Sequence, residues 1–290
     1  MNAILLIVVV FAWGLSWYGI LLQVGEASAL ISVTYRFYMA AAVMCAGLWL
    51  TGRLKPIPPS DHKLLAALGF CLFSMNFLCF YIAANYLPSG ILSVVFATAA
   101  IFGAINGWLF LGQKLEAKVF LAAGLGLVGL ALLLSPEFDG SSGQDVPIWA
   151  IALPFFGTML FSFGNIASAK LSTRHALPNI VGQGMVWGAI HLTVLCLVTG
   201  ESFVVPATLS YWGGMVFLAL VSSLLAFLTY LTLVNRIGTA RAAYATVLFP
   251  IVAMLISTFA EGYEWGLVPA LGLVMALGGT VLIFGKRSVR

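Results

Sequence analysis

The basic residues of this chain alternate with long apolar stretches, and their positions constrain the fold more than any other feature. Ten apolar stretches can be counted. Every lysine and arginine except Arg36 lies in an even-numbered connection between them or after the last one, at Arg53, Lys55, Lys63, Lys114, Lys118, Lys170, Arg174, Arg236, Arg241, Lys286, Arg287 and Arg290. Basic residues beside a membrane span stay on the cytoplasmic side. The pattern therefore predicts ten transmembrane spans with both termini in the cytoplasm.

The composition excludes a water-soluble domain. Apolar residues make up 62% of the 290 residues and charged residues 8%, whereas soluble domains carry about 25% charge. A helix needs about 20 residues to cross the hydrocarbon core, so ten helices leave only short loops. The runs 4–12 and 119–134 do not alternate in polarity, as the strands of a membrane barrel would. We therefore expect an all-α integral membrane protein.

The ten predicted spans fall into two sets of five. They lie near 3–22, 28–51, 64–85, 90–111, 117–134, 147–169, 179–199, 210–234, 241–260 and 267–285. The longest connection, 135–147, is rich in turn-forming and acidic residues and separates the two sets. Because five is odd, the second set starts on the opposite side of the membrane. We therefore predict two inverted five-helix repeats, residues 1–135 and residues 147–290.

A faint likeness between the halves supports the repeat. At a shift of 150 residues, Trp13-Gly14 aligns with Phe163-Gly164, and Asn85 aligns with Asn235. The charge topology and the hydropathy show the same two-fold layout. Transporters built from inverted repeats hold their substrate near the midplane, where the repeats meet.

Aromatic and small polar residues gather at mid-depth in the first and sixth spans. Trp13, Ser16 and Trp17 lie in the first span, and Phe163 and Asn165 lie in the sixth. Polar groups at this depth are costly unless they face protein or a cavity, and an indole N–H needs a hydrogen-bond partner there. Two interpretations are open: these residues pack helices together, or they line a central cavity that binds substrate.

Other candidate cavity residues come from the third, seventh and ninth spans. They are Asn76, Tyr81, Trp187, His191 and Tyr244. Histidine titrates near physiological pH, so His191 either carries a coupling proton or donates one hydrogen bond to a neighbouring helix.

Arg36 is the one basic residue deep within a predicted span, about two turns from its outer end. A charge inside the membrane is a functional hypothesis by default. The alternative is a structural role, in which the long side chain snorkels outward or caps the last carbonyls of a helix. In the functional interpretation, Arg36 attracts a substrate carboxylate or takes part in coupling.

Several absences narrow the function. No aspartate or glutamate lies deep within a predicted span, which argues against organic cations as the main substrates and favours neutral, zwitterionic or aromatic solutes. The four cysteines lie in apolar spans without metal-type spacing, so we expect no metal and no cofactor. No basic stripe suggests nucleic acid. The expected partners are a small-molecule substrate and the lipid bilayer, with the protein as a monomer or weak homodimer.

The motif residues resemble the drug/metabolite transporter superfamily, in its EamA-type group. Trp13-Gly14 with Ser16, then Arg36, then Pro250 followed by Glu261-Gly262 carry the resemblance, which covers the whole chain. The matching positions of the first half are Ala100, Leu111 and Gly112, so the proline and the glutamate of the motif are missing there. Within the superfamily, the mid-depth tryptophans and the lack of buried carboxylates are similar to YddG-type exporters of aromatic amino acids.

The resemblance implies a transporter of the bacterial inner membrane that exports aromatic and other neutral amino acids and related metabolites by alternating access. The alternatives are a transporter of another metabolite class, such as purines, nucleotide sugars or drugs, or a channel. An enzyme is disfavoured because no catalytic constellation such as H-E-x-x-H or G-x-S-x-G is present. The glycines of the fifth and tenth spans are expected to serve as scaffold or as a dimer contact. They are Gly124, Gly126, Gly129, Gly272, Gly278 and Gly279.

Overall fold

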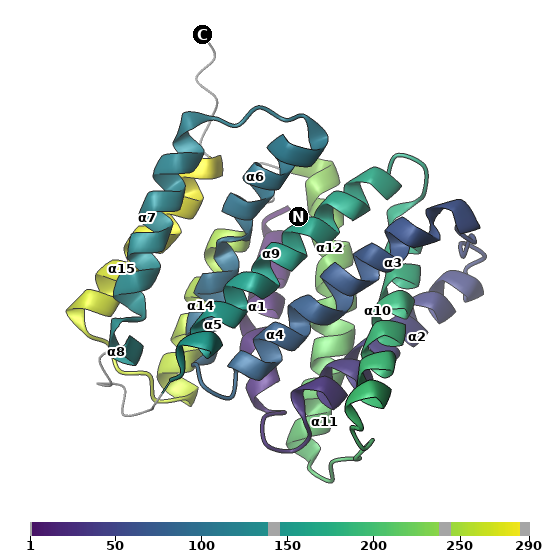
Figure 1. Ribbon diagram of the computed structural model, residues 1–290, viewed down its shortest axis with the longest axis horizontal. Helices are drawn as coiled ribbons and strands as arrows, with labels where there is room; N and C mark the ends of the chain where they lie inside the picture. Colours follow the sequence, from purple (N-terminus) through teal and green to yellow (C-terminus); the bar gives the residue numbers. More distant parts are fainter. Residues whose placement is uncertain (1, 139–145, 238–244, 285–290) are drawn as a thin grey trace.

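The computed structural model describes residues 2–138, 146–237 and 245–284, and all regular elements within these residues are helical (Figure 1). Seven of the helices are long and apolar enough to cross a membrane, and three further apolar helices are shorter. In position, these helices match the ten predicted spans. The all-α prediction is therefore confirmed for the described part of the chain.

The first half contains the following elements. They are α1 (Asn2–Leu21), α2 (Ala29–Leu50), the short 3₁₀ turn η1 (Pro59–Asp61), α3 (His62–Phe70), the π-helical segment η2 (Cys71–Met75), α4 (Asn76–Ala83), α5 (Ser89–Ala97), α6 (Ala99–Leu111), α7 (Ala117–Leu133) and α8 (Ser135–Phe138). Elements η1 to α4 form one continuous span, Pro59–Ala83, and α5 with α6 forms the next, Ser89–Leu111.

The second half repeats this order. It contains α9 (Ile148–Leu171), α10 (Leu177–Thr199), α11 (Leu209–Val216), the π-helical segment η3 (Phe217–Leu225), α12 (Ala226–Ile237), α14 (Ala245–Ala260) and α15 (Leu267–Phe284). In Figure 1, the α6–α7 and α9–α10 connections lie at the upper edge and the α10–α11 connection lies at the lower edge. Connections predicted to share one side of the membrane therefore lie at the same end of the bundle.

The two π-helical segments occupy equivalent places in the two halves. Segment η2 ends at Met75 and segment η3 ends at Leu225, a separation of 150 residues, and an α-helix follows each directly. This is the same shift that relates the halves in sequence. A π-helical segment disturbs the regular i to i−4 hydrogen bonding and often marks a functional region. The shared position supports the predicted repeat through a feature that hydropathy does not reveal.

The halves differ at their fourth helices. The span Ser89–Leu111 is interrupted at Thr98, between α5 and α6, whereas the equivalent helix α14 runs unbroken through Pro250. The break therefore lies in the half that lacks the proline. Before this break α5 packs along α14, and after it α6 packs against α9.

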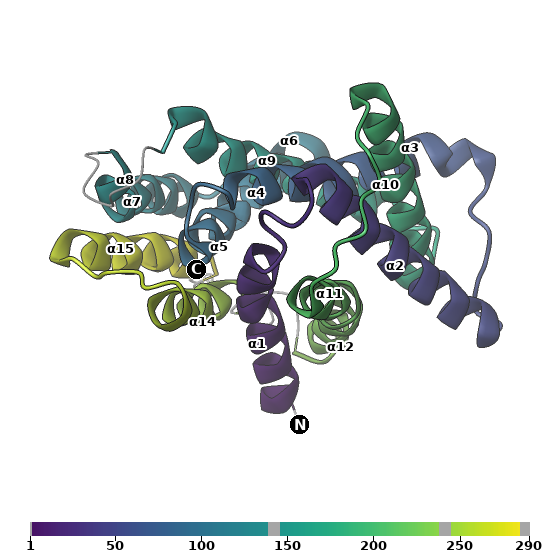
Figure 2. The same cartoon turned by 90° about the horizontal axis from the view of Figure 1, so that it is seen from below.

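The last long helix of each half, α7 and α15, which we call the closing helices, run side by side at one end of the molecule (Figures 1 and 2). A methyl group on Gly129 would lie 2.7 Å from the Gly272 carbonyl oxygen, and one on Gly279 would lie 2.6 Å from the Ala122 carbonyl oxygen. Glycine at these positions lets the two backbones touch. The expected scaffold role is supported, because these glycines face each other within one chain.

The outer surface of the bundle is strongly apolar. Leu209, Phe259 and Leu267 are each more than four-fifths exposed, and many other large apolar side chains are half exposed. A soluble monomer rarely leaves so much apolar surface in water. This surface fits the hydrocarbon of a bilayer, and the chain is a multi-pass membrane protein.

Candidate functional site

Helix α1 lies against helices from both halves, and its glycines make this close approach possible. A methyl group on Gly14 would lie 2.7 Å from Cβ of Val252 in α14, and one on Gly19 would lie 3.2 Å from the Leu218 side chain in η3. Because the glycine faces are occupied in this way, Trp17 is held within the bundle and is only 7% exposed. The sequence therefore fixes α1 as a central helix and places its indole rings in the interior.

Seven aromatic side chains form a continuous set of ring contacts around α1, which we call the aromatic cluster. Its members are Trp13, Trp17, Phe80, Phe96, Phe161, Tyr230 and Phe249. They come from α1, α4, α5, α9, α12 and α14. Ring centroids 4.5–7 Å apart with tilted or edge-to-face geometry attract each other beyond simple burial. The cluster therefore joins both halves of the chain through aromatic contacts.

The two halves contribute equivalent residues to the tryptophans of α1. Trp17 contacts Phe80 with ring centroids 5.1 Å apart, and Trp13 contacts Tyr230 at the same separation of 5.1 Å. Phe80 and Tyr230 are 150 residues apart and so occupy matching positions in the repeat. The tyrosine adds a hydroxyl group on one side only. The two tryptophans therefore have pseudo-symmetric ring partners that differ by one hydroxyl group.

The indole N–H of Trp13 has the partner that its depth requires. It donates a hydrogen bond to the Ser222 carbonyl oxygen, with Nε1 and the oxygen 3.3 Å apart. Ser222 lies in η3, where the shifted hydrogen-bond pattern of a π-helical segment makes a carbonyl available to an outside donor. This hydrogen bond joins α1 to the second half of the chain through a backbone carbonyl oxygen, which sequence alone does not identify as a partner.

Among the α9 candidates, the structure places Phe161 in the aromatic cluster, and not Phe163. Phe163 contacts Phe110 of α6 at 5.8 Å, and Asn165 is exposed. Residues two apart on a helix point about 200° apart, so Phe161 and Phe163 cannot face the same wall. The buried polar residues of this helix are Thr158 and Ser162, and Ser162 accepts a hydrogen bond from Asn106 Nδ2 at 2.8 Å.

Ser16 is buried within the bundle, but its hydroxyl group serves its own helix. It donates to the Trp13 carbonyl oxygen at 2.6 Å. Such a bond satisfies a polar group within apolar surroundings at no cost to helix packing. Ser16 therefore lies beside the aromatic cluster with its donor already occupied.

Trp187 and His191 form a separate group on α10. Their rings lie 5.9 Å apart, Trp187 contacts His62 at 6.0 Å, and His191 contacts Phe70 at 5.6 Å. A methyl group on Gly69 would lie 2.6 Å from Cβ of Trp187, so α3 and α10 are in close contact here. In the described part of the chain, the ring contacts of Trp187 and His191 join α10 to α3 and do not include the aromatic cluster.

Asn76 and Gln23 are buried polar residues with incomplete hydrogen bonding. Asn76 follows η2 and donates weakly to the Leu72 carbonyl oxygen at 3.5 Å, while its Oδ1 atom has no partner among the described residues. Gln23 is 1% exposed, and neither amide atom has a partner there. Sequence analysis missed Gln23, because a glutamine at a span end reads as an interfacial residue. Tyr244 lies outside the described residues.

Arg36 is buried within the bundle and is 2% exposed. Its Nε and Nη2 atoms both donate to Oγ of Ser223, at 3.2 and 3.0 Å. The guanidinium carbon lies 4.4 Å from the centre of the Phe77 ring, a distance typical of a cation–π contact. The side chain thus contacts η3 and α4 and does not extend to the surface.

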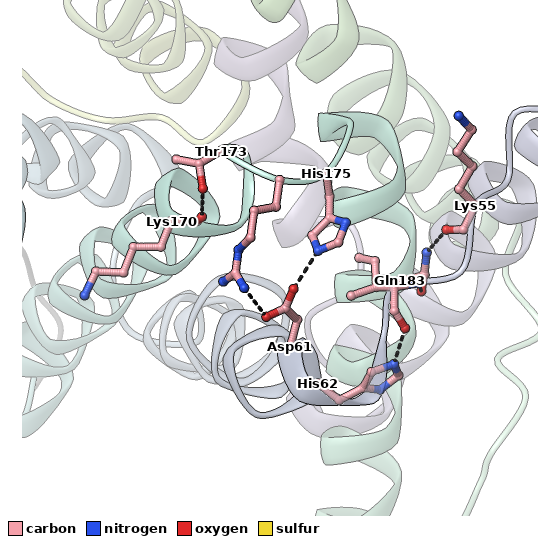
Figure 3. Close-up of polar contacts among 9 residues, drawn as sticks. Lys55, Asp61, His62, Lys170, Thr173, His175 and Gln183 are labelled. Atoms are coloured by element: carbon pink, nitrogen blue, oxygen red, sulfur yellow. Dashed lines mark hydrogen bonds and ion pairs between the residues drawn. The ribbon is translucent and has the colours of Figure 1, made fainter.

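A polar junction joins two connections that are predicted to be cytoplasmic. Asp61 accepts hydrogen bonds from Nη1 of Arg174 at 2.8 Å and from Nε2 of His175 at 2.7 Å (Figure 3). The nearby Gln183 side chain donates to the Lys55 carbonyl oxygen at 2.9 Å. These contacts hold the connection between α2 and α3 against the start of α10. Their position at one end of the bundle agrees with the charge pattern of the sequence.

A second polar junction lies at the opposite end. The Glu261 carboxylate accepts hydrogen bonds from the backbone N–H and the hydroxyl group of Ser89, the first residue of α5. A carboxylate at a helix N-terminus interacts favourably with the helix dipole. A cleft of about 740 Å³ opens beside it and includes Glu137 and Tyr263. Burial, with the negative charge of Glu137 as a smaller cause, raises the pKa of Tyr263 to about 12.

Known proteins share this architecture. The EamA-like transporter family matches residues 1–135 and 148–285. A protein of Escherichia coli (strain K12) named "uncharacterized inner membrane transporter YedA" is 28% identical over 280 residues, covering 93% of this chain and 86% of its own. Another protein of that strain, named "probable amino-acid metabolite efflux pump", is 24% identical over 302 residues, covering 99% and 96%.

A solved crystal structure has the same fold, with a TM-score of 0.67 at 17% identity over 97% of this chain and 95% of the other. The family match extends over nearly the whole chain. The apolar helices described above fit a protein of this family, which spans the membrane. The protein is therefore a membrane transporter, and it belongs to the EamA-like transporter family.

Proposed function

We propose that this protein exports aromatic and other neutral amino acids across the bacterial inner membrane, with both termini in the cytoplasm. The observation that carries the proposal is the aromatic cluster, which both halves build around α1. Aromatic walls hold ring-bearing solutes by stacking and burial. The two buried acids of the described residues, Asp61 and Glu137, lie at span ends and away from this cluster, so the centre offers no counter-charge for an organic cation.

The names of the relatives support the substrate class. One relative over nearly the full length of the chain is named a probable amino-acid metabolite efflux pump. That substrate agrees with a ring-lined centre that also holds one buried arginine. We therefore place amino acids ahead of purines, nucleotide sugars and drugs as substrates of this chain.

The proposed mechanism is alternating access between the two halves. Glu261 fastens the N-terminus of α5 to the end of α14 on the outer side, whereas α6 turns toward α9 after the break at Thr98. The arrangement favours a state that loads substrate from the cytoplasm. Release to the outside then requires the Glu261 contacts with Ser89 to break.

Replacing Glu261 by leucine, the residue at the equivalent position of the first half, tests this outer junction. The variant loses two hydrogen bonds to a charged acceptor, together worth about 2 kcal/mol, and we expect the outer ends of α5 and α14 to separate more often. Labelling by a membrane-impermeant thiol reagent of a cysteine introduced at Ser93, which is buried one turn further along α5 and bonds within its own helix, should become several-fold faster. Glu264→Leu is the matched control, since Glu264 is exposed on the same connection; equal labelling rates in both variants would contradict the proposal.

Transport by purified protein in liposomes tests the function directly. Liposomes preloaded with labelled phenylalanine or tryptophan should lose it faster with the protein than without, and the rate should saturate with concentration. The same preparation is assayed with a purine, a nucleotide sugar and a cationic drug, each with and without a pH gradient. Efflux of one of these compounds, with no efflux of any amino acid, would reassign the substrate. A rate that rises linearly with concentration, without saturation, would indicate a channel.

A further inference from the structure

Arg36 is a buried cation that lacks an anionic partner. In the part of the chain that the structure describes, the ion pairs join Lys118 to Glu116 and Asp61 to Arg174 and His175, and none involves Arg36. Its Nη1 atom is fully buried and has no hydrogen-bond acceptor. A buried charge without a counter-ion is strongly unfavourable. The guanidinium group therefore has an unused donor and an uncompensated charge in the same place.

A second buried polar group lies beside Arg36. Tyr81 is 2% exposed, and its hydroxyl group interacts with the Arg36 guanidinium group without forming a hydrogen bond of full geometry. Phe77 and Tyr81 are four residues apart on α4 and so share one face, and Phe77 carries the guanidinium group over its ring. The Nη1 atom of Arg36 and the Tyr81 hydroxyl group therefore lie side by side between α2 and α4, and neither makes a well-formed hydrogen bond.

This polar pair adjoins the aromatic cluster. Ser223 holds the Arg36 guanidinium through its hydroxyl group, and the preceding residue, Ser222, accepts the Trp13 indole N–H. On the other wall, Tyr81 directly follows Phe80, whose ring contacts Trp17 at 5.1 Å. Adjacent residues of η3 and of α4 thus connect the aromatic cluster to the Arg36 guanidinium group and the Tyr81 hydroxyl group. A solute that spans this boundary needs a ring at one end and an anion at the other.

We propose that Arg36 and Tyr81 form a carboxylate subsite, so that the transporter selects its substrates by their carboxylate and not by their ammonium group. The guanidinium fork matches a carboxylate in shape and charge, and the Nη1 atom is its available donor. Binding of the anion neutralises the buried charge. The inference rests on the proposed function and adds to it that aromatic monocarboxylates without an amino group are bound, whereas the decarboxylated amines are not.

The structural alternative for Arg36 does not account for these contacts. The side chain is buried, so it does not snorkel to the surface, and its hydrogen bonds go to a side-chain hydroxyl group and not to the last carbonyls of a helix. A purely structural clamp between α2 and η3 would need only the two bonds to Ser223. It leaves the buried charge without an anion and the Nη1 atom without a well-formed hydrogen bond.

The test is competition in proteoliposome counterflow of labelled phenylalanine, using 3-phenylpropionate and phenethylamine. The first compound is phenylalanine without its amino group, and the second is phenylalanine without its carboxylate. We expect 3-phenylpropionate to compete and phenethylamine not to compete. Arg36→Met should raise the KM for phenylalanine about 10- to 100-fold, with a smaller change in kcat. The KM of Arg36→Lys should lie between that of the wild type and that of Arg36→Met. Ser223→Ala, which keeps the charge, should change KM less than Arg36→Met.

The outcomes separate this inference from the proposed function. If phenethylamine competes as well as 3-phenylpropionate, or if Arg36→Met leaves the preference unchanged, the carboxylate subsite is disproved. If the wild type transports no amino acid, the proposed function fails, and the subsite is tested alone by the rise in melting temperature of the detergent-solubilised protein with each compound. If Arg36→Met does not fold, competition in Arg36→Lys decides the question. Lysine lacks the forked guanidinium group, so this variant must bind 3-phenylpropionate more weakly while its binding of phenethylamine stays unchanged.

Discussion

Replacing Trp17 by alanine is expected to slow the efflux of aromatic amino acids at least tenfold. Trp17 contacts Phe80, Phe96 and Phe249, with ring centroids 5.1, 5.6 and 6.4 Å away. Each such pair contributes about 0.5–1.5 kcal/mol beyond simple burial, and a tenfold loss of rate requires about 1.4 kcal/mol. A substrate ring that packs against Trp17 in the same way loses contacts of this size in the alanine variant, and one or two such contacts suffice for the expected effect.

The measurement is the initial efflux rate per folded protein in preloaded liposomes. Normalisation is needed because removing a buried aromatic ring costs about 3–5 kcal/mol of stability. Trp17→Phe keeps a ring at this position and should recover most of the rate. Trp149→Ala is the matched control, because Trp149 is 48% exposed and contacts Tyr86 at the edge of the bundle. An efflux rate for Trp17→Ala equal to that of Trp149→Ala would remove the aromatic cluster from the transport path.

Replacing Gly272 by leucine is expected to separate the closing helices α7 and α15 and to destabilise the protein by about 3 kcal/mol or more. A methyl group at this position already meets the Gly129 carbonyl oxygen at 2.5 Å and the carbonyl carbon of Leu132 at 2.9 Å. These are backbone atoms, which cannot move aside as a flexible side chain could. The larger side chain therefore forces the helices apart along their length.

Apparent melting temperature and yield in detergent measure this effect. Gly278→Leu is the control on the same helix, and Gly124→Leu is the control on α7, because a side chain at either position meets nothing within 4 Å. All of these substitutions add the same apolar volume to a membrane helix, so insertion into the bilayer is matched. Leucine is a better helix former than glycine, so helix propensity cannot cause a loss, and melting temperatures that fall equally in the three variants would show that the packing of α7 on α15 is not its cause.

Part of the candidate site could be predicted from the sequence. Trp13 and Trp17 were expected in the interior because they share a helical face and flank the helix-packing glycine Gly14. The structure places both in the aromatic cluster. Arg36 was recognised because a lone charge in an apolar span is rare and costly. These residues could be found because a polar or glycine neighbour distinguishes them from the surrounding apolar background.

The remaining cluster residues could not be found in this way. Phe80, Phe96 and Phe249 lie in apolar runs that contain other phenylalanines, and a phenylalanine facing lipid has the same hydropathy as one facing the centre. The choice of Phe163 over Phe161 came from aligning the halves, but helical rotation decides which of the two enters the cluster. The tenfold difference expected at Trp17 is thus tied to partners that the sequence does not identify.

The number and positions of the apolar helices, and the alternation of their connections, were determined by the sequence, because the cost of burying charge in hydrocarbon is felt residue by residue. Only the tertiary structure decided which faces of those helices meet. Lipid and protein interior are equally apolar, so hydropathy cannot distinguish a side chain that faces one from a side chain that faces the other. Packing alone produces the close backbone approach at Gly14 and Gly272, the hydrogen bond from Trp13 to the Ser222 carbonyl oxygen in η3, and the placement of Arg36 beside Tyr81. Helices are specified locally, whereas the site is a property of how they pack.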